Sequence, residues 1–467
     1  MIRLVIAAPT SGVGKTTVTS GLGRALRRRG LRVQPFKAGP DYIDPGYHER
    51  ATGRRSRNLD TWMIPPAALR ELFERASSDA DVVLIEGMMG LFDGRGSGDE
   101  GSTAHLAKLL DVPVVVIVDV AKTSRSAGAI ALGCKQFDPA VRVVGYVLNG
   151  VGGDAHRSWA SDAITGATGL PVFGALSHRD DLALPERHLG LIPTTEEQVG
   201  DQFFEKVADQ IDRSFDLDAL LEAGRGDPPK LSSESILFPK SSRPVTTRIG
   251  IAADEAFGFY YEDNLDLLRA WGAQLVSFSP LRDATVPPGV GALYLGGGFP
   301  ELYAQTLAGN TSMLDSLRHA ASDGLPIYAE CGGMMYLSRG IVDFDGRRHD
   351  LVGLVPAWSA MTSHRLTLGY RELRARSSTP VMRQGEVGRG HEFHWSILDA
   401  PLSAEDAAYE VLQAPISREG YARGNLLASY CHLHFGSNPA MAPNFVEVAR
   451  NWSTGAGRHG ESSRWPG

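Results

Sequence analysis

The sequence predicts an α/β protein made of two doubly wound, Rossmann-like domains. Three observations lead to this fold class. The chain has 467 residues, too many for a single hydrophobic core. Short β-branched, apolar runs alternate with helical stretches in both halves, which is typical of buried parallel strands covered by helices. Between the halves, residues 225–247 are rich in Pro, Ser and charge, and the periodicity is lost there.

Each element is predicted from its apolar pattern. In the first half, strands are expected at Arg3–Ala8, Asp81–Glu86, Val112–Val118 and Val141–Leu148, and helices at Thr16–Arg29 and Thr103–Leu110. In the second half, strands are expected at Arg248–Ala252, Gln274–Phe278, Ala292–Leu295 and Pro326–Ala329. We therefore predict a first domain at 1–224, a linker at 225–247 and a second domain at 248–452. The Gly/Ser/Arg-rich stretch 453–467 is predicted to be a disordered tail.

The bulk composition limits the class of partner. A net charge of −7 and a pI near 6.0 argue against a nucleic-acid binder, which usually carries a basic surplus. Apolar runs stay short of the roughly 18–20 residues that a membrane span needs, and the first run is too short for a signal peptide. Three cysteines are too few for a disulfide scaffold, so we expect a reducing, cytoplasmic setting. A homodimer is compatible with the sequence.

A phosphate-binding loop is predicted near the N-terminus. The segment APTSGVGKTT follows a strand and opens a helix, which is the context that a P-loop needs. Its backbone amides and Lys15 would surround the phosphates, while Thr16 would offer a hydroxyl to Mg²⁺. The usual first glycine is replaced by Pro9, and the alternative is a glycine turn with a chance Lys-Thr pair. The predicted ATP-binding residues of the loop are Gly12, Val13, Gly14, Lys15, Thr16 and Thr17.

Further side chains at strand ends are predicted to complete this nucleotide site. Asp41 and Glu86 follow strand-like runs and would face the ligand crevice as metal-binding carboxylates, together with Thr16. Lys37 is a candidate for contact with a transferred phosphate. Asn149 ends a strand and could hydrogen-bond the base. The alternative for each acid taken alone is a solvated loop charge.

A reactive thiol is predicted at Cys331. This residue follows a strand-like run and precedes two glycines and a helical run, so the nucleophile would stand at a strand-to-helix corner. A helix N-terminus at that corner favours thiolate. The alternative is a buried structural cysteine, the commoner fate of a lone thiol.

The thiol needs a base and an oxyanion site. His432 and His434, in YCHLHF, are the candidate bases, and His391 and His394 are rivals that could contact substrate or be structural. Cys431 is expected to be structural. A glycine run follows the strand at Ala292–Leu295, and its amides could stabilise a tetrahedral oxyanion. The candidate oxyanion residues are Gly297, Gly298 and Gly332.

Taken together, these segments resemble the cobyrinic acid a,c-diamide synthase family, which also includes hydrogenobyrinic acid a,c-diamide synthases. The resemblance rests on APTSGVGKTT, FKAGPDYIDPGYH, RNLDTWM, EGMMGLFDG, AFGFYYEDNLDLL, YLGGGFPE, AECGGMMYL and ASYCHLHFGSNP. It implies a dethiobiotin-synthetase-like, P-loop NTPase-like ATP domain joined to a class I glutamine amidotransferase domain. In this type the catalytic His follows a Tyr-x pair, which assigns His432. Many class I relatives carry Glu two residues later, where this chain has His434, so the third triad member stays open.

The resemblance also implies the reaction. We expect ATP- and glutamine-dependent amidation of the a and c carboxylates of a corrin in cobalamin biosynthesis, by way of an acyl phosphate and with Mg²⁺. Arg54, Arg55 and Arg57 could hold substrate carboxylates, and the alternative is a solvated basic loop. Related enzymes act on cobyric acid precursors or nickel-sirohydrochlorin. Sequence motifs alone distinguish poorly between enzymes with these different substrates. A ParA/MinD-like switch ATPase is disfavoured, because its signature Lys is replaced by Thr10. A binding module with an inactive amidotransferase half is disfavoured by Cys331 and His432.

Overall fold

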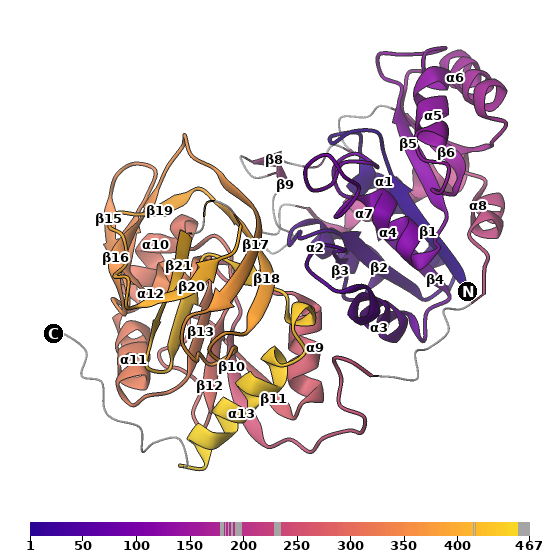
Figure 1. Ribbon diagram of the computed structural model, residues 1–467. Coiled ribbons are helices and arrows are strands. Elements are labelled where there is room, and N and C mark those ends of the chain that lie inside the picture. Colours follow the sequence, from indigo (N-terminus) through magenta and orange to yellow (C-terminus); the bar gives the residue numbers. More distant parts are fainter. Residues whose placement is uncertain are drawn as a thin grey trace. The chain divides into compact units, whose positions relative to one another are not determined.

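The chain divides into two compact units, Met1–Ser233 and Glu234–Gly467. In this computed structural model the described residues are 1–177, 182, 184, 186–187, 190–191, 199–227, 235–413, 415 and 417–455. Residues 228–234 of the predicted linker and 456–467 of the predicted tail lie outside them. Figure 1 draws the first unit from indigo to pink and the second from pink to yellow.

The first unit is built on a parallel sheet of seven strands in the order β3-β2-β4-β1-β5-β6-β7. The apolar runs form its centre; in β5, for example, every residue except the last is buried. Strand bounds are β1 Ile2–Ala7, β2 Val33–Ala38, β3 Arg57–Leu59, β4 Val82–Glu86, β5 Val114–Asp119, β6 Val143–Val151 and β7 Val172–Ser177. A small antiparallel pair adds β8 Glu186–Arg187 and β9 Gly190–Leu191. The predicted parallel, doubly wound sheet is confirmed.

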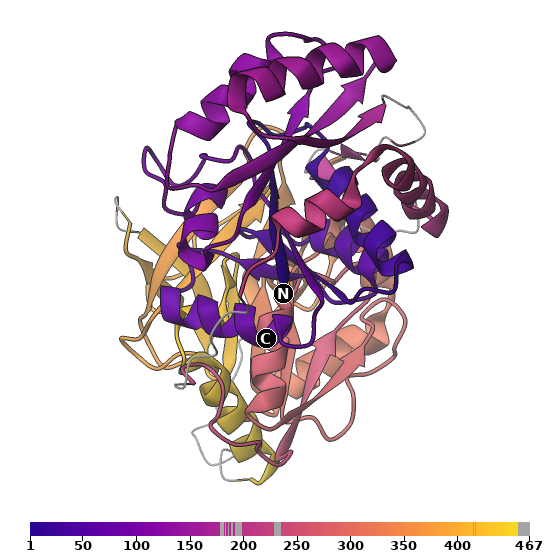
Figure 2. The same ribbon diagram turned by 90° about the vertical axis from the view of Figure 1, so that its right-hand side faces the viewer.

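Helices cover both faces of this sheet (Figure 1 and Figure 2). One group packs α1 against α2 and α7, and a second packs α5 against α6. The bounds are α1 Lys15–Arg28, α2 Asp44–Thr52, α3 Pro66–Ser77, α4 Thr103–Leu110, α5 Ala127–Gln136, α6 Asp154–Thr168, α7 Asp201–Ser214 and α8 Leu217–Ala223. Each of the two helices predicted in this half therefore lies within one residue of its expected start and end.

The second unit has a larger, mixed sheet in the order β11-β10-β12-β13-β22-β21-β20-β17-β18-β23. The first five strands in this order, which end with β22, pair in parallel. The pairs from β22 onward to β23 are antiparallel. Bounds are β10 Thr247–Ala252, β11 Ala273–Phe278, β12 Ala292–Leu295, β13 Ile327–Glu330, β17 Thr367–Ala375, β18 Val387–His394, β20 Ala407–Val411, β21 Ser417–Arg423, β22 Leu426–Ser429 and β23 His432–Leu433. The predicted strands of this half are β10 to β13; the antiparallel part was not predicted.

Among the described residues of the second unit there are also a smaller sheet and five α-helices. The sheet has the order β15-β14-β16-β19, with bounds β14 Ser338–Val342, β15 Arg348–Asp350, β16 Val355–Met361 and β19 Ser396–Leu398. Helix bounds are α9 Glu262–Ala270, α10 Ala304–Gly309, α11 Thr311–Ser322, α12 Gly332–Leu337 and α13 Met441–Ser453, with 3₁₀ turns at η3 Pro300–Tyr303 and η4 Phe435–Ser437. Helix α9 packs against α13.

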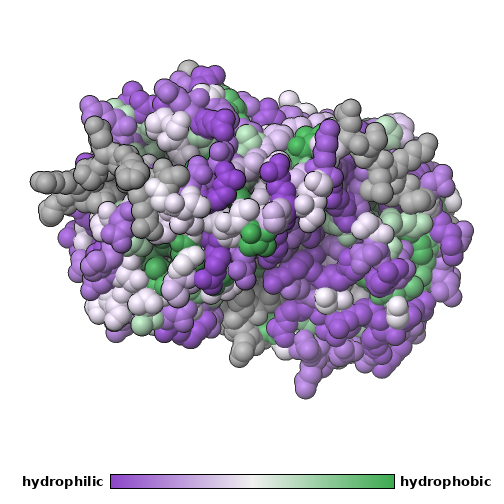
Figure 3. Space-filling model, turned by 90° about the horizontal axis from the view of Figure 1, so that it is seen from below, coloured by the Kyte–Doolittle hydropathy of each residue, from purple (hydrophilic) through white to green (hydrophobic). Residues whose placement is uncertain are grey.

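Apolar side chains are largely sequestered in the two units. Separate buried clusters underlie the sheets of each unit. On the face drawn in Figure 3, hydrophilic residues predominate and hydrophobic ones are scattered among them. Within the part of the chain that the structure describes, no helix has the length and hydropathy of a membrane span.

The carboxyl ends of the parallel strands carry the chemistry-bearing residues of both units. In the first unit, β2, β4 and β1 are neighbours, and they end beside Lys37, Glu86 and the P-loop respectively. In the second unit, β13 lies between β12 and β22 and leads directly into Cys331. Ligands of open α/β sheets bind at such carboxyl ends, so the topology predicts one site in each unit.

Candidate active sites

The P-loop of the first unit turns from β1 into α1 through two glycines. Gly12 has φ 75° and Gly14 has φ 86°, the left-handed region that favours glycine. A Cβ on Gly14 would also lie 2.5 Å from the side-chain nitrogen of Asn149. Asn149 donates a hydrogen bond from that nitrogen to the carbonyl of Val13, at 2.9 Å. Asn149, predicted to contact the base, is therefore held against the loop itself.

Lys15 is the first residue of α1 and is 8% exposed. Its ammonium donates to the carbonyls of Thr10 (3.0 Å) and Met89 (2.7 Å). Burial, with the neighbouring Lys37 ammonium, lowers the pKa of Lys15 to about 8. Met89 has φ 49°, an uncommon conformation for a residue other than glycine. Phosphate oxygens would compete with these two carbonyls for the Lys15 ammonium.

Glu86 is the buried hub of the nucleotide site, with no exposed surface. Its carboxylate accepts hydrogen bonds from the Thr16 hydroxyl (2.9 Å) and the Lys37 ammonium (2.8 Å). Its second oxygen lies 2.5 Å from Nε2 of His48. Burial alone would raise the pKa of Glu86, but Lys37 and His48 hold it below its ordinary value. The structure thus brings together Thr16, Lys37 and Glu86, which the sequence singled out separately.

Lys37 lies in a carboxylate cage that sequence reasoning recovered only in part. Its ammonium is 2.5 Å from Oδ2 of Asp44, 2.8 Å from Glu86 and 3.8 Å from Asp41. Burial opposes its charge, yet these carboxylates raise the pKa of Lys37 above its ordinary value. Asp44 and His48 were missed, although both lie within the segment FKAGPDYIDPGYH.

The oxygen atoms at this edge fit a Mg²⁺ ion bound with a nucleotide. Mg²⁺ prefers oxygen ligands and commonly takes one or two from the protein, the rest coming from phosphates and water. The Thr16 hydroxyl and the Glu86 carboxylate meet this description, and Asp41 lies near Lys37. Among the described residues, no group of three or more His, Cys, Asp or Glu side chains forms a closed metal cage.

The three arginines predicted to hold substrate have different surroundings. Arg54 is bidentate to Asp79, at 2.9 and 2.6 Å, and also donates to Gln34 near the amino end of β2. Arg55 pairs with Glu49 at 3.3 Å. Arg57 lies on β3, in register with Phe36. The structure therefore does not bring Arg54 to the carboxyl edge where Lys15 and Glu86 meet, and the substrate role of the three residues stays a prediction.

Cys331 occupies the predicted strand-to-helix corner between β13 and α12. Its φ of 45° and ψ of −104° form a sharp turn that a residue other than glycine rarely adopts. Such conformations typically cost about 1–3 kcal/mol and concentrate at functional sites. The turn is held by a 2.7 Å hydrogen bond from the Cys331 amide to the Ser429 carbonyl. The side chain is buried, with 5% exposure.

His432 is the histidine that the structure places at the thiol. Burial opposes its charge, but the hydrogen-bonded Cys331 sulfur and the Glu330 carboxylate raise the pKa of His432 to about 10. Nδ1 of His432 lies 3.7 Å from Oε2 of Glu330. A base in contact with the thiol and a carboxylate behind the base are the parts of a nucleophilic triad. Glu330 was overlooked, although it directly precedes Cys331 in AECGG.

The other candidate histidines are held in neutral form. Burial lowers the pKa of His434 to about 3, and its ring lies 4.0 Å from Asp263 and against Tyr261. Burial and the neighbouring His432 lower the pKa of His391 to about 3. His394 is stacked on Tyr430 with ring centroids 4.0 Å apart. His434 therefore packs against Tyr261 and Asp263, and the catalytic role considered for it stays a prediction.

The glycine run lies beside the thiol and its base. A Cβ on Gly297 would lie 2.4 Å from Cε1 of His432, so only glycine leaves room for the imidazole. The Gly297 amide itself donates to the Phe259 carbonyl at 3.2 Å. A Cβ on Gly332 would lie 3.0 Å from the Gly298 nitrogen, and Gly332 begins α12, where helix amides lack internal partners. Gly298 and Gly332 therefore lie close together at the Cys331 corner, and their role as oxyanion donors stays a prediction, whereas the Gly297 amide is bonded to Phe259.

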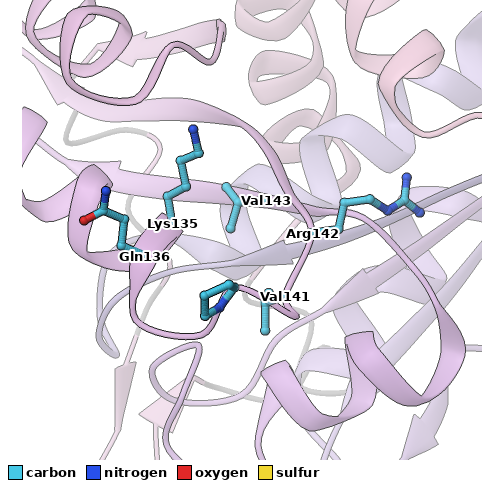
Figure 4. Close-up of a pocket in the computed structure, with 6 residues that line it drawn as sticks. Lys135, Gln136, Val141, Arg142 and Val143 are labelled. Atoms are coloured by element: carbon cyan, nitrogen blue, oxygen red, sulfur yellow. The ribbon is translucent and has the colours of Figure 1, made fainter.

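Cys431 and a surface hollow lie outside both sites. Cys431 has no exposed surface, and burial raises its pKa above the ordinary value, as expected for a structural thiol. A hollow of about 610 Å³ is lined by Lys135, Gln136, Pro139, Val141, Arg142 and Val143. Figure 4 shows these side chains around it. It adjoins the amino end of β6, the edge of the sheet opposite the P-loop. Its residues take no part in the predicted chemistry.

Comparison with known proteins identifies a family for each unit. Residues 4–192 match the family described as the CobQ/CobB/MinD/ParA nucleotide binding domain, and residues 248–440 match the CobB/CobQ-like glutamine amidotransferase domain. The fold and the two sites therefore define a glutamine-dependent amide ligase.

The full-length relatives are more specific. The chain is 43% identical to cobyrinate a,c-diamide synthase of Dehalococcoides mccartyi strain CBDB1, over 97% of this chain and 99% of the relative. It is 44% identical to that of Picrophilus torridus (96% and 99%) and 42% identical to that of Salmonella typhimurium (96% and 98%). The chain belongs to the cobyrinate a,c-diamide synthase family.

Proposed function

We propose that this protein amidates the a and c side-chain carboxylates of a corrin, cobyrinic or hydrogenobyrinic acid, at the expense of ATP and glutamine. The observation that carries this proposal is that each unit gathers a different set of reactive side chains at the carboxyl ends of its parallel strands. A buried P-loop cluster around Lys15 suits phosphoryl transfer, and a strained thiol with a histidine base suits amide hydrolysis. The substrate follows the three relatives described above, each of which is a cobyrinate a,c-diamide synthase.

In the first unit, the proposed reaction is transfer of the γ-phosphoryl group of ATP to a substrate carboxylate. The carboxylate oxygen attacks phosphorus, ADP leaves, and an acyl phosphate forms. Lys15 and Lys37 offset the negative charge that develops on the transferred group. Thr16, Glu86 and Asp41 would hold Mg²⁺, which neutralises phosphate charge when bound. Glu86 and Asp44 keep Lys37 protonated and fix its position.

In the second unit, the proposed reaction is release of ammonia from glutamine. His432 holds the proton of the Cys331 thiol in a thiolate–imidazolium pair, and the thiolate sulfur attacks the carboxamide carbon. The Gly298 and Gly332 amides stabilise the tetrahedral oxyanion. Collapse of this intermediate releases ammonia, with a proton returned from His432, and leaves a thioester that water hydrolyses to glutamate. Ammonia then displaces phosphate from the acyl phosphate. Two rounds give the diamide.

The compartment proposed for this chemistry is the reducing cytoplasm. All three cysteines, Cys134, Cys331 and Cys431, are free thiols and buried. A nucleophilic thiol such as Cys331 works only while it stays reduced.

The substrate is tested by mass spectrometry of the products. Purified protein is incubated with ATP, Mg²⁺ and glutamine, and with either hydrogenobyrinic acid or cobyrinic acid. We expect the mass change of two hydroxyl-to-amino replacements on at least one of the two acids, and the acid that reacts identifies the state of the ring. Amidation of nickel-sirohydrochlorin with neither corrin modified would overturn the proposed substrate.

A further inference from the structure

Glu330 is a buried carboxylate that no part of the proposed reaction yet uses. It ends β13, directly before Cys331, and is 1% exposed. Its Oε1 accepts hydrogen bonds from the Tyr328 hydroxyl and from the Leu433 amide (2.9 Å), and its Oε2 accepts from the Tyr294 hydroxyl (2.9 Å). A carboxylate surrounded by donors in this way is fixed in position and stabilised as an acceptor.

Next to the thiol, His432 lies between this carboxylate and Cys331. Its Nδ1 is 3.7 Å from Oε2 of Glu330, and the same ring is hydrogen-bonded to Cys331. With Nδ1 turned toward the carboxylate, Nε2 is the nitrogen left to face the sulfur. The adjacent Leu433 amide binds Glu330 as well, so the carboxylate anchors both the backbone and the ring of this segment.

We propose that Glu330 is the positioning carboxylate of the Cys331–His432 pair and so completes the triad. This inference rests on the proposed glutaminase function of the second unit. Glu330 sets the orientation of the imidazole and the tautomer with hydrogen on Nδ1. With the thiol proton on Nε2, the resulting imidazolium is stabilised by the neighbouring carboxylate. The usual position two residues after the base is occupied by His434, whose pKa of about 3 follows from its burial.

Other charged groups near His432 do not fill this role. The titratable groups that face it are Cys331 and Glu330 from the β13 corner and His391, Glu392 and His394 from β18. Glu392 is engaged in an ion pair with Arg371 at 2.8 Å. Burial gives His391 and His394 pKa values of about 3 and about 4, so both are neutral at physiological pH. Glu330 is thus the carboxylate within 4 Å of the His432 ring among the described residues.

The test compares Glu330→Gln with Tyr328→Phe. The first keeps the shape of the side chain but removes its charge, and the second removes one hydrogen bond and keeps the carboxylate. We expect Glu330→Gln to lower glutaminase kcat by about 10³-fold, since neutralising the carboxylate of a serine-protease triad costs about 10⁴-fold. Tyr328→Phe should lose much less. Synthesis from added ammonia should be unchanged in both variants, because the ligase site lies in the other unit.

A pH profile separates positioning from a merely structural role. The rate of Cys331 alkylation by iodoacetamide is measured against pH in the wild type and in Glu330→Gln. Without the carboxylate the thiolate–imidazolium pair is less stable, so the apparent pKa of alkylation should rise in the variant. An unchanged profile with unchanged glutaminase kcat would overturn the inference. If Glu330→Gln does not fold, Glu330→Asp carries the same test, with a smaller shift in the same direction expected and an unchanged profile contradicting it.

Cys331→Ser distinguishes the failure of this inference from failure of the proposed function. If Cys331→Ser retains glutaminase activity, the thiol is not the nucleophile and the proposed function of the second unit fails. If Cys331→Ser is inactive while Glu330→Gln remains fully active, the proposed function stands and the role assigned to Glu330 is wrong.

Discussion

The two sites differ in how their parts are brought together. At the thiol site, Cys331 and Glu330 are sequence neighbours, and His432 comes from far along the chain. At the nucleotide site, Lys15, Lys37, Asp44, His48 and Glu86 come from three separate segments and form one buried charge network. The thiol site thus depends on a strained local corner, and the nucleotide site on long-range charge balance. Changes at the first should affect glutamine use alone, and changes at the second should affect ligation from any nitrogen source.

The largest effect is expected from His432→Ala. Loss of the base that activates the Cys331 thiol should lower glutaminase kcat by about 10²–10⁴-fold, the usual range for a general base. Synthesis with ammonium chloride should continue at the wild-type rate. The matched control is His349→Ala, which removes a histidine paired with Asp343 on a different sheet. Equal loss with both nitrogen sources would break the distinction between the two sites.

A slightly smaller effect is expected from Lys37→Met. The variant removes the cation between Asp44 and Glu86 and leaves buried carboxylates without their partner. We expect ATP-dependent amidation to fall by roughly 10²–10³-fold with glutamine and with ammonia alike. Glutaminase activity measured alone should persist. Lys135→Met, at the opposite edge of the sheet, serves as the control and should be active; a glutamine-specific defect in Lys37→Met would argue against the assignment.

The third prediction concerns the space around His432. In Gly297→Ala the new methyl group would lie 2.4 Å from the imidazole, so the ring must move. Because a displacement of about 1 Å at a catalytic group can cost about 10²-fold, we expect a loss of this size in glutaminase kcat. Gly309→Ala, where a Cβ meets nothing within 4 Å, is the control. A wild-type glutaminase kcat in the Gly297→Ala variant would show that the His432 ring is less confined than its contacts indicate.

The smallest effect is a pH dependence of nucleotide binding. Burial and the Lys37 ammonium lower the pKa of Lys15 to about 8, while Glu86, Asp44 and Asp93 partly oppose the shift. Below this pH the ammonium is charged and attracts phosphate; above it the proton is lost. The Kd for ATP should therefore rise by up to about tenfold per pH unit above pH 8. In Lys15→Arg, whose guanidinium stays charged, calorimetric titration should show no such rise over the same range.

The local parts of both sites could be predicted from sequence. The P-loop and the Cys331 corner each depend on a short strand-turn-helix segment, in which spacing and small residues carry the signal. The metal and phosphate candidates Thr16, Lys37 and Glu86 could be found because each stands at a strand or helix end. Their mutual contacts could not, because a strand-end position does not say which side chains will meet.

Site residues whose partners lie far away in the sequence could not be predicted for the same reason. Asp44 and His48 look like loop and helix residues until α2 brings them to Lys37 and Glu86. Glu330 reads as one more residue of a buried strand, since its partner His432 lies about a hundred residues away. The antiparallel strands β17 to β21 carry fewer continuous apolar runs, because one face of such strands is often polar.

The central claim is that the two units divide the reaction between them. It is tested most directly by assaying Cys331→Ser and Lys15→Ala, each with glutamine and with added ammonia, by following corrin amidation. We predict that Cys331→Ser is inactive with glutamine but active with ammonia, and that Lys15→Ala is inactive with both. Loss of ammonia-dependent amidation in a folded Cys331→Ser, or its retention in Lys15→Ala, would contradict the account.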